Sequence, residues 1–91
     1  MEIDLEKIRE IYGNSSIYEI SDNIDELKAN MKYLYNLGIE DVLNVIELYP
    51  YMFLQERDIF KEKVDNLIDK LGTDYIEKLS EDFNLWSEVD E

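Results

Sequence analysis

The chain has 91 residues with 9 basic and 23 acidic side chains, which gives a formal net charge of −14. Nucleic-acid phosphate is bound by clustered lysine and arginine, so this charge disfavours direct nucleic-acid binding. The chain contains neither cysteine nor histidine, which excludes disulfides and the usual zinc, haem and Cys/His nucleophile sites. Hydrophobic residues make up 45% of the sequence, too many for a disordered acidic chain.

Apolar periodicity predicts an all-α fold in a single domain, residues 1–91, with about five helices. In chain order, the helices are expected at about 4–12, 23–37, 40–49, 56–71 and 74–82. The segment 13–16 should break the chain after the first helix, and 50–54 should form a 3₁₀ turn because Pro50 ends the helix before it. Ser21 or Asp22 and Thr73 are suited to cap the helices that follow them.

Two glycines mark a repeat. Gly38 and Gly72 each follow the last apolar residue of a helix, as a left-handed C′ residue does, and they are 34 residues apart. Residues 5–38 align with 39–72 without a gap, a truncated third unit covers 73–86, and 87–91 form an acidic tail that we expect to be disordered. The pattern predicts a short helical repeat, or solenoid, of two and a half units, each with a short and a long helix.

The expected core consists of the apolar residues that recur at helical spacing. These are Ile8, Ile11, Ile24, Leu27, Met31, Leu34, Val42, Val45, Ile46, Phe60, Val64, Leu67, Ile68, Leu71, Ile76 and Leu79. Tyr12 and Tyr49 also fall on apolar faces and are expected in the core.

A 34-residue helical repeat first suggests the tetratricopeptide class, but the single alanine, Ala29, argues against its close helix contacts. The segment 27–53 has a long helix ending in Leu37-Gly38, a short helix, and Pro50 followed by hydrophobic residues. It resembles the repeat of the mitochondrial transcription termination factor (mTERF) family. The resemblance implies a curved solenoid over about residues 5–83 and, as a function, nucleic-acid binding through basic surface residues.

The helix predicted at 56–71 carries a row of carboxylates opposite its apolar stripe. The row could mimic the phosphates of a nucleic-acid backbone, or it could be an ordinary solvated helix face. Like charges four residues apart are mildly unfavourable, yet such pairs recur elsewhere, as in Asp22/Glu26 and Glu77/Glu81. The candidate partner-binding residues comprise this row, the two like-charge pairs and two aromatic residues. They are Asp22, Glu26, Tyr33, Asp58, Glu62, Asp65, Asp69, Glu77, Glu81 and Trp86.

The two aromatic candidates each have an alternative role. Tyr33 points away from the apolar stripe of its helix and suits a recognition surface beside carboxylates, or it covers a helix joint. Trp86, with Phe83, either docks in a partner's groove or caps the open end of the solenoid, and we favour the cap.

No catalytic set, cofactor site or metal site is predicted, so we expect a protein that is not an enzyme.

The leading hypothesis is a small acidic interaction protein that binds a basic protein partner. In its concrete form the protein mimics nucleic acid and inhibits a nucleic-acid-binding protein, as phage-encoded inhibitors of restriction or CRISPR systems do. The alternatives are an mTERF-like nucleic-acid-binding regulator, with Lys28, Lys32, Lys61 and Lys63 clustered, and a scaffolding module whose charge only confers solubility. A homodimer through the open solenoid end is also possible. No signal peptide or membrane-spanning segment is visible, so a cytoplasmic location without membrane contact is expected.

Overall fold

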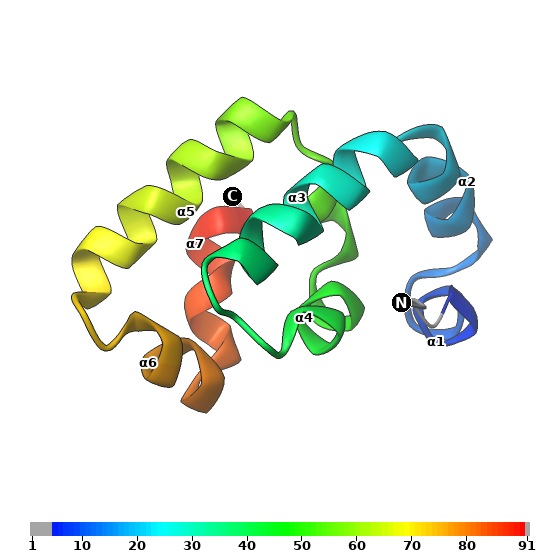
Figure 1. Ribbon diagram of the computed structural model, residues 1–91. Helices are drawn as coiled ribbons and strands as arrows, with labels where there is room; N and C mark the ends of the chain where they lie inside the picture. The colour runs from blue at the N-terminus through cyan, green and yellow to red at the C-terminus, as the bar shows by residue number, and fades with distance from the viewer. Residues whose placement is uncertain (1–4, 91) are drawn as a thin grey trace.

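The computed structural model describes residues 5–90 and is built from helices throughout (Figure 1). The α-helices are α1 (Leu5–Tyr12), α2 (Asn14–Asp22), α3 (Ile24–Asn36), α4 (Val42–Leu48), α5 (Arg57–Leu71), α6 (Tyr75–Glu81) and α7 (Ser87–Asp90), and the 3₁₀ helices are η1 (Pro50–Leu54) and η2 (Phe83–Trp86). Residues 5–90 contain no strand, so the predicted all-α class is confirmed.

Shorter and longer helices follow one another along the chain, with α3 and α5 the longest. The two long helices, α3 and α5, run along one side of the molecule, and the short helices α1, α4 and α6 lie along the other (Figure 1). Helix α7 packs against α5 and η1. The molecule measures 38 × 25 × 24 Å along its principal axes. Within residues 5–90, no helix has both the length and the apolar composition needed to cross a bilayer.

The five predicted helices are present as α1, α3, α4, α5 and α6, with ends within two residues of those expected. The 3₁₀ turn at 50–54 is confirmed as η1. Gly38 and Gly72 have φ of +94° and +83°, as expected of residues that turn the chain after a helix. Positions 4 and 91, the predicted start of the first helix and end of the tail, lie outside the described residues.

The break predicted at 13–16 is confirmed at Gly13, where α1 has ended, but is wrong for 14–16, which are helical. Gly13 turns the chain with φ +91°, but the helix resumes at once as α2. Ser16 is buried, and its Oγ donates to the Gly13 carbonyl at 2.7 Å, which satisfies the hydroxyl inside the first turn. Ile20, only 2% exposed, anchors α2 in the core. In the alignment Ser16 and Ile20 correspond to the two ends of η1, so the same place in the repeat holds a longer helix in the first unit.

The tail predicted as disordered at 87–91 is also wrong for Ser87–Asp90, which form α7. Val89 is fully buried there, and the Gln55 side-chain amide donates to its carbonyl at 2.8 Å. The buried valine, this hydrogen bond and an ion pair between Lys70 and Glu88 at 3.3 Å hold the acidic segment on the domain.

The core matches the prediction in the helix interiors and departs from it at the helix ends. The predicted residues that are buried are Ile8, Leu27, Met31, Leu34, Val42, Val45, Ile46, Phe60, Val64, Leu67 and Leu79, and Ile68 and Leu71 are half-buried. Ile11 (58% exposed), Ile24 (36%) and Ile76 (42%) were wrongly placed in the core. Each lies in the first or last turn of its helix, where neighbouring elements cover only part of the side chain. Tyr12, predicted in the core, is also exposed, whereas Tyr49 is half-buried.

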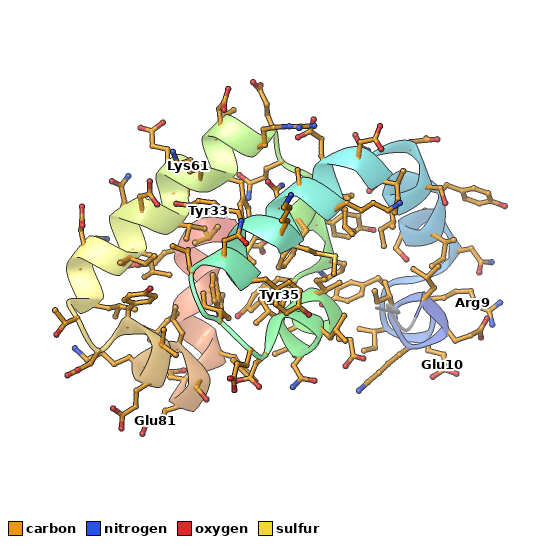
Figure 2. All side chains as sticks on the ribbon, in the orientation of Figure 1. Arg9, Glu10, Tyr33, Tyr35, Lys61 and Glu81 are labelled. Carbon is orange, nitrogen blue, oxygen red and sulfur yellow. The ribbon has the colours of Figure 1, made fainter. Side chains whose placement is uncertain are left out.

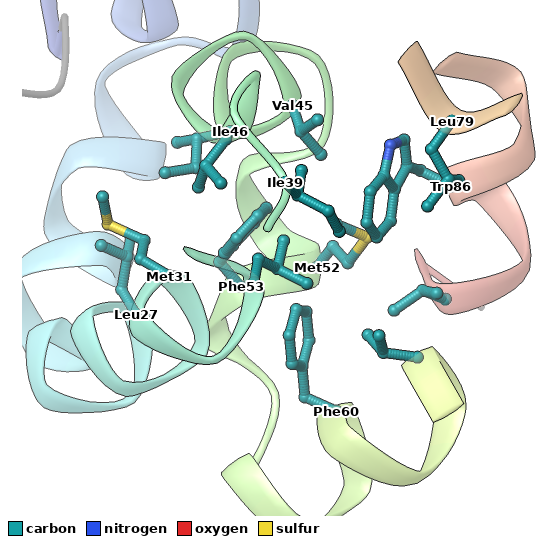
Figure 3. Close-up of a cluster of buried hydrophobic side chains, with 14 of the residues drawn as sticks. Leu27, Met31, Ile39, Val45, Ile46, Met52, Phe53, Phe60, Leu79 and Trp86 are labelled. Atoms are coloured by element: carbon teal, nitrogen blue, oxygen red, sulfur yellow. The ribbon is translucent and has the colours of Figure 1, made fainter. Parts of the chain in front are cut away.

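Several buried residues were not expected. The centre of the core, shown in Figure 3, includes Met52 and Phe53 from η1, and the Phe53 and Phe60 rings lie 5.4 Å apart between centroids. The others are Ile20, Ile39, Trp86 and Val89. Most of these residues lie in short or 3₁₀ segments, which have too few turns for a 3.6-residue period to reveal the buried face.

The long helices are joined to their neighbours by polar contacts. Asn30 is buried in α3, and its Nδ2 donates to the carbonyls of Phe53 and Gln55, both at 2.9 Å. These carbonyls lie at the end of η1, so Asn30 satisfies backbone groups that the short helix leaves unpaired.

The predicted caps Ser21, Asp22 and Thr73 are wrong: the cap positions are Asn23 and Asp74, and neither makes a side-chain cap bond.

Candidate acidic interaction surface

The four carboxylates predicted on one face of the long second-unit helix do lie together on the outside of α5. Asp58, Glu62 and Asp69 are exposed, and Asp65 is half-buried. Phe60, Val64 and Leu67 on the opposite face are buried, because α5 packs on α3 and α7 through that side. We call these four carboxylates the α5 row.

Tyr33 binds a member of the α5 row. Its ring is half-buried against the core, and its hydroxyl donates to Oδ1 of Asp65. Burial, reinforced by this hydrogen bond, raises the pKa of Tyr33 to about 12, so the hydroxyl stays protonated at neutral pH. Of the two roles predicted for Tyr33, the structure favours the second: it covers the α3–α5 joint and holds Asp65 inward.

Glu26 is also engaged within the chain. Its two carboxylate oxygens accept from the Arg57 backbone N–H at 3.0 Å and from the guanidinium at 3.1 and 3.3 Å. The hydrogen bond with Arg57 holds the pKa of the Glu26 carboxyl below its usual range. Glu26 thus joins α3 to the first residue of α5, whereas Asp22, the other member of its predicted pair, is exposed at the end of α2.

The α5 row is not a continuous negative stripe. Residues 57–71 carry four acidic and four basic side chains, so α5 has no excess of either sign. A shallow hollow on its surface is lined by Asp58, Lys61, Glu62, Asp65 and Asn66, which places a lysine among the carboxylates. Because a lysine lies among its carboxylates, the α5 row attracts a basic partner less strongly than the carboxylates would by themselves.

The excess of negative charge lies elsewhere, toward the C-terminus. Residues 74–91 carry seven acidic side chains and one lysine. Glu77 and Glu81 are exposed on α6, and Figure 2 shows Glu81 on the opposite side of the molecule from Lys61 of α5. The predicted candidates therefore do not form one surface, since α5 and α6 present theirs in different directions.

A cleft lies between α4 on one side and α6 with η2 on the other. It has a volume of about 60 Å³ and combines apolar walls, among them Val45, Leu79 and Trp86, with the polar residues Glu40, Asp41 and Ser80. Glu40 and Asp41, which sequence reasoning missed, precede α4; their only signal is two adjacent carboxylates after the turn at Gly38. We call this feature the α4–α6 cleft.

Trp86 lies beneath that cleft and not on the surface. Its side chain is 0% exposed, which agrees with the favoured role of covering the core and not with docking in a partner's groove. It packs where the truncated third unit meets α4, since the cleft walls come from both. Its indole Nε1 is buried and has no hydrogen-bond acceptor among residues 5–90.

Most of the basic side chains are held by the protein itself. Of the 9 lysines and arginines, six donate to oxygen atoms of the chain within residues 5–90. The acceptors are Glu47 for Lys7, Glu6 for Arg9, Glu26 for Arg57, Gln55 for Lys63, Glu88 for Lys70 and the Leu71 carbonyl for Lys78. Lys28, Lys32 and Lys61 are exposed. Lys63, predicted to cluster with them, is half-buried.

Within the described part of the chain, no three carboxylates converge closely enough to hold a metal ion.

Comparisons of the chain with family models, with curated proteins and with solved structures found no match.

Proposed function

We propose that this protein is a non-enzymatic interaction protein that binds a basic protein partner through its acidic surface. In the concrete form of the proposal, it mimics nucleic acid and blocks the nucleic-acid-binding surface of that partner, as inhibitors of restriction or CRISPR systems do. One observation carries the proposal. Six of the nine lysine and arginine side chains donate hydrogen bonds to oxygen atoms of the chain, while the net charge is −14.

The α4–α6 side is the part of the surface best suited to this role. Glu77 and Glu81 are exposed on α6, and Glu40 and Asp41 line the cleft between α6 and α4. The lysine of this region, Lys78, donates to the Leu71 carbonyl at 2.6 Å, so its ammonium group is engaged at the end of α5. Carboxylates that outnumber the cations on one side of a molecule speed association with a basic target and make it sensitive to salt.

The first prediction concerns these carboxylates. Glu77→Gln with Glu81→Gln should weaken binding to the basic partner by roughly tenfold, mainly through a slower association rate. Asp58→Asn with Glu62→Gln, the matched control with the same change in charge on α5, should have a much smaller effect. The partner is first isolated from cell extract on the immobilised wild-type chain, and its binding rates are then measured at increasing salt.

Two outcomes would contradict the proposal. The first is a captured partner that stays bound in about half-molar salt, where the Debye length is only a few ångströms. The second is capture of proteins without any basic surface, which would favour the alternative of a scaffolding module without an electrostatic target. Equal losses in the α5 and α6 variants would assign the binding to net charge and not to the α4–α6 side.

The alternative function is direct nucleic-acid binding, as the resemblance to the mTERF repeat implies. One observation favours it: Lys28, Lys32 and Lys61 are exposed on the two long helices. A shallow groove between α3 and α5 has Arg57 and Lys61 among its lining residues and Ala29 and Tyr33 on its other wall. This groove also contains Asp58, so its charge is mixed.

The second prediction separates the two functions. Under the leading proposal, the isolated wild-type chain should not retard duplex DNA or RNA in a gel at about 0.1 M salt, because phosphate contacts require clustered cations. Retardation by the wild-type chain that disappears in the Lys28→Glu, Lys32→Glu and Lys61→Glu triple variant would replace the leading proposal with the alternative. A circular-dichroism melt of the triple variant controls for its folding.

A further inference from the structure

Tyr12 at the end of α1 and Tyr51 in η1 meet at the molecular surface. Their ring centroids lie 6.0 Å apart, and the two ring planes make an angle of 84°. Tyr12 is 36% exposed and Tyr51 is 38% exposed, so solvent reaches both side chains. We call this pair the tyrosine corner.

A hydrogen bond fixes one ring of the tyrosine corner. The Tyr12 hydroxyl donates to the backbone carbonyl of Leu48 at 2.5 Å, which ties the end of α1 to the end of α4. Burial raises the pKa of this hydroxyl, and the negative charge of Asp90 raises it further, so the phenol stays protonated at neutral pH. Because its one proton is already used, what Tyr12 offers a partner is the face of its ring, which carries negative potential.

Asp90 adds a full negative charge beside the tyrosine corner. It is exposed at the end of α7, which packs against η1, the element that contains Tyr51. Its effect on the pKa of Tyr12 agrees with this position. Among residues 5–90, no lysine or arginine forms an ion pair with Asp90, since the ion pairs there use Glu6, Glu26, Glu47 and Glu88. The Asp90 carboxylate is therefore available to a cation from outside the chain.

Two ring faces and a carboxylate together favour a cation. A positive charge is attracted to a tyrosine ring when it lies within about 6 Å of the centroid. With ring planes at 84° and centroids 6.0 Å apart, a cation about 4 Å above each plane lies within about 6 Å of both centroids. An anion would be repelled by Asp90 and by the ring faces, and an apolar side chain would gain nothing from the carboxylate. A second copy of the chain would bring another net charge of −14.

We propose that the tyrosine corner, together with Asp90, binds an arginine or lysine side chain of the basic partner. The cationic group lies against both ring faces, and its N–H groups donate to the Asp90 carboxylate. This inference rests on the proposed function, which supplies a partner with exposed cations, and it adds a contact in which aromatic rings as well as a carboxylate hold the cation.

The experiment compares arginine with citrulline, which has nearly the same shape and no charge. The full chain, carrying carbon-13 in its tyrosine rings, is titrated with capped Gly-Arg-Gly or capped Gly-citrulline-Gly, and the ring signals are followed by NMR. Gly-Arg-Gly should shift the ring signals of Tyr12 and Tyr51 in a saturable way, with a Kd of about 10 mM at low salt. Gly-citrulline-Gly should bind at least roughly fivefold more weakly, because it has no charge for the rings or the carboxylate to attract.

Variants distinguish the ring faces from general attraction to an acidic protein. Tyr51→Phe keeps a ring and should leave the Kd of Gly-Arg-Gly within about twofold of the wild-type value. Tyr51→Leu, followed through the Tyr12 signal, and Asp90→Asn should each weaken binding by roughly three- to tenfold. Tyr18→Leu is the control, since Tyr18 on α2 is 71% exposed and has no ring contact among residues 5–90. It should leave the Kd unchanged, and a circular-dichroism melt checks that each variant is folded.

The outcomes separate this inference from the proposed function. Equal shifts with the two peptides, or equal losses in Tyr51→Phe and Tyr51→Leu, would overturn the cation site. Ring signals of Tyr12 and Tyr51 that move on dilution without peptide would assign the tyrosine corner to contact between copies of the chain and overturn it as well. If Gly-Arg-Gly leaves both rings unmoved while a basic partner is captured and released by salt, the cation site fails and the proposed function survives. If the rings respond as expected but the captured partner stays bound in about half-molar salt, the cation site stands and the electrostatic function fails.

Discussion

Replacing Asn30 with Asp should lower the free energy of unfolding by about 3–5 kcal/mol at pH 7. The Asn30 amide donates to two carbonyls at 2.9 Å, and the side chain is buried. A carboxylate in its place has no proton to donate and brings a negative charge against two carbonyl oxygens. Thermal unfolding followed by circular dichroism should show a melting temperature lower by more than about 10 °C.

The loss of unfolding free energy should depend on pH, because the folded and unfolded states favour different protonation states of the introduced carboxyl. The buried position disfavours the charged form, so the pKa of the introduced carboxyl is raised in the folded state above its unfolded value of about 3.9. The protonated form is relatively favoured by folding. The penalty is therefore smallest below about pH 4 and grows as the pH rises through the raised folded pKa.

The control for this variant is Asn66→Asp, an exposed position in the middle of α5. It adds the same charge to the same kind of helix and should change the stability by less than about 0.5 kcal/mol. Similar melting temperatures for the two variants would show that Asn30 does not hold η1 to α3, contrary to its hydrogen bonds.

Truncating Phe60 should also destabilise the domain strongly. Phe60 is 0% exposed and its ring packs 5.4 Å from that of Phe53, so Phe60→Ala removes a large apolar group from the centre of the core. Changes of this kind cost about 3–5 kcal/mol, a large share of the stability of a domain this size. Denaturant unfolding followed through Trp86 fluorescence measures the loss, since this single tryptophan is fully buried.

The neighbouring residue provides the matched control. Ile59 lies on the same helix but is 46% exposed, so Ile59→Ala should cost less than about 1 kcal/mol. A Phe60→Ala loss no larger than that of Ile59→Ala would mean that α5 does not pack on η1 through this face.

The variants also separate stability from binding. The carboxylate substitutions on α5 and α6 lie at exposed positions and should leave the melting temperature nearly unchanged. A binding defect in Glu77→Gln with Glu81→Gln can then be assigned to the surface. Loss of binding in Phe60→Ala would carry no such information, because it would follow from unfolding.

The candidate surface was predicted only in part. Periodicity placed Asp58, Glu62 and Asp69 on the exposed side of α5, because a carboxylate opposite a buried stripe has no other direction to face. It missed that Asp65 is bound by Tyr33 and Glu26 by Arg57, since these partners lie 32 and 31 residues away in the chain. Long-range pairing of this kind has no signature in a helical wheel.

Trp86 illustrates the same limit. Its spacing from Phe83 indicated a shared helix face, and nothing in the local sequence shows that α4 covers that face. Its burial depends on the third unit folding back against residues some 40 positions earlier, so only the assembled structure places the indole N–H under the α4–α6 cleft. Glu40 and Asp41 become part of a site for the same reason.

The all-α class, the five main helices and the buried faces of their interiors follow from local sequence patterns, because those properties depend on residues three or four positions apart. The turns at Gly38 and Gly72 follow from the same local order, since a positive φ favours glycine at that place. The helices α2 and α7 could not be predicted from local patterns, since each is held by a buried side chain, Ile20 or Val89, on an element that packs against distant elements. The tertiary structure also decided which charges remain available to a partner, because ion pairs and buried hydrogen bonds form between helices and not along them.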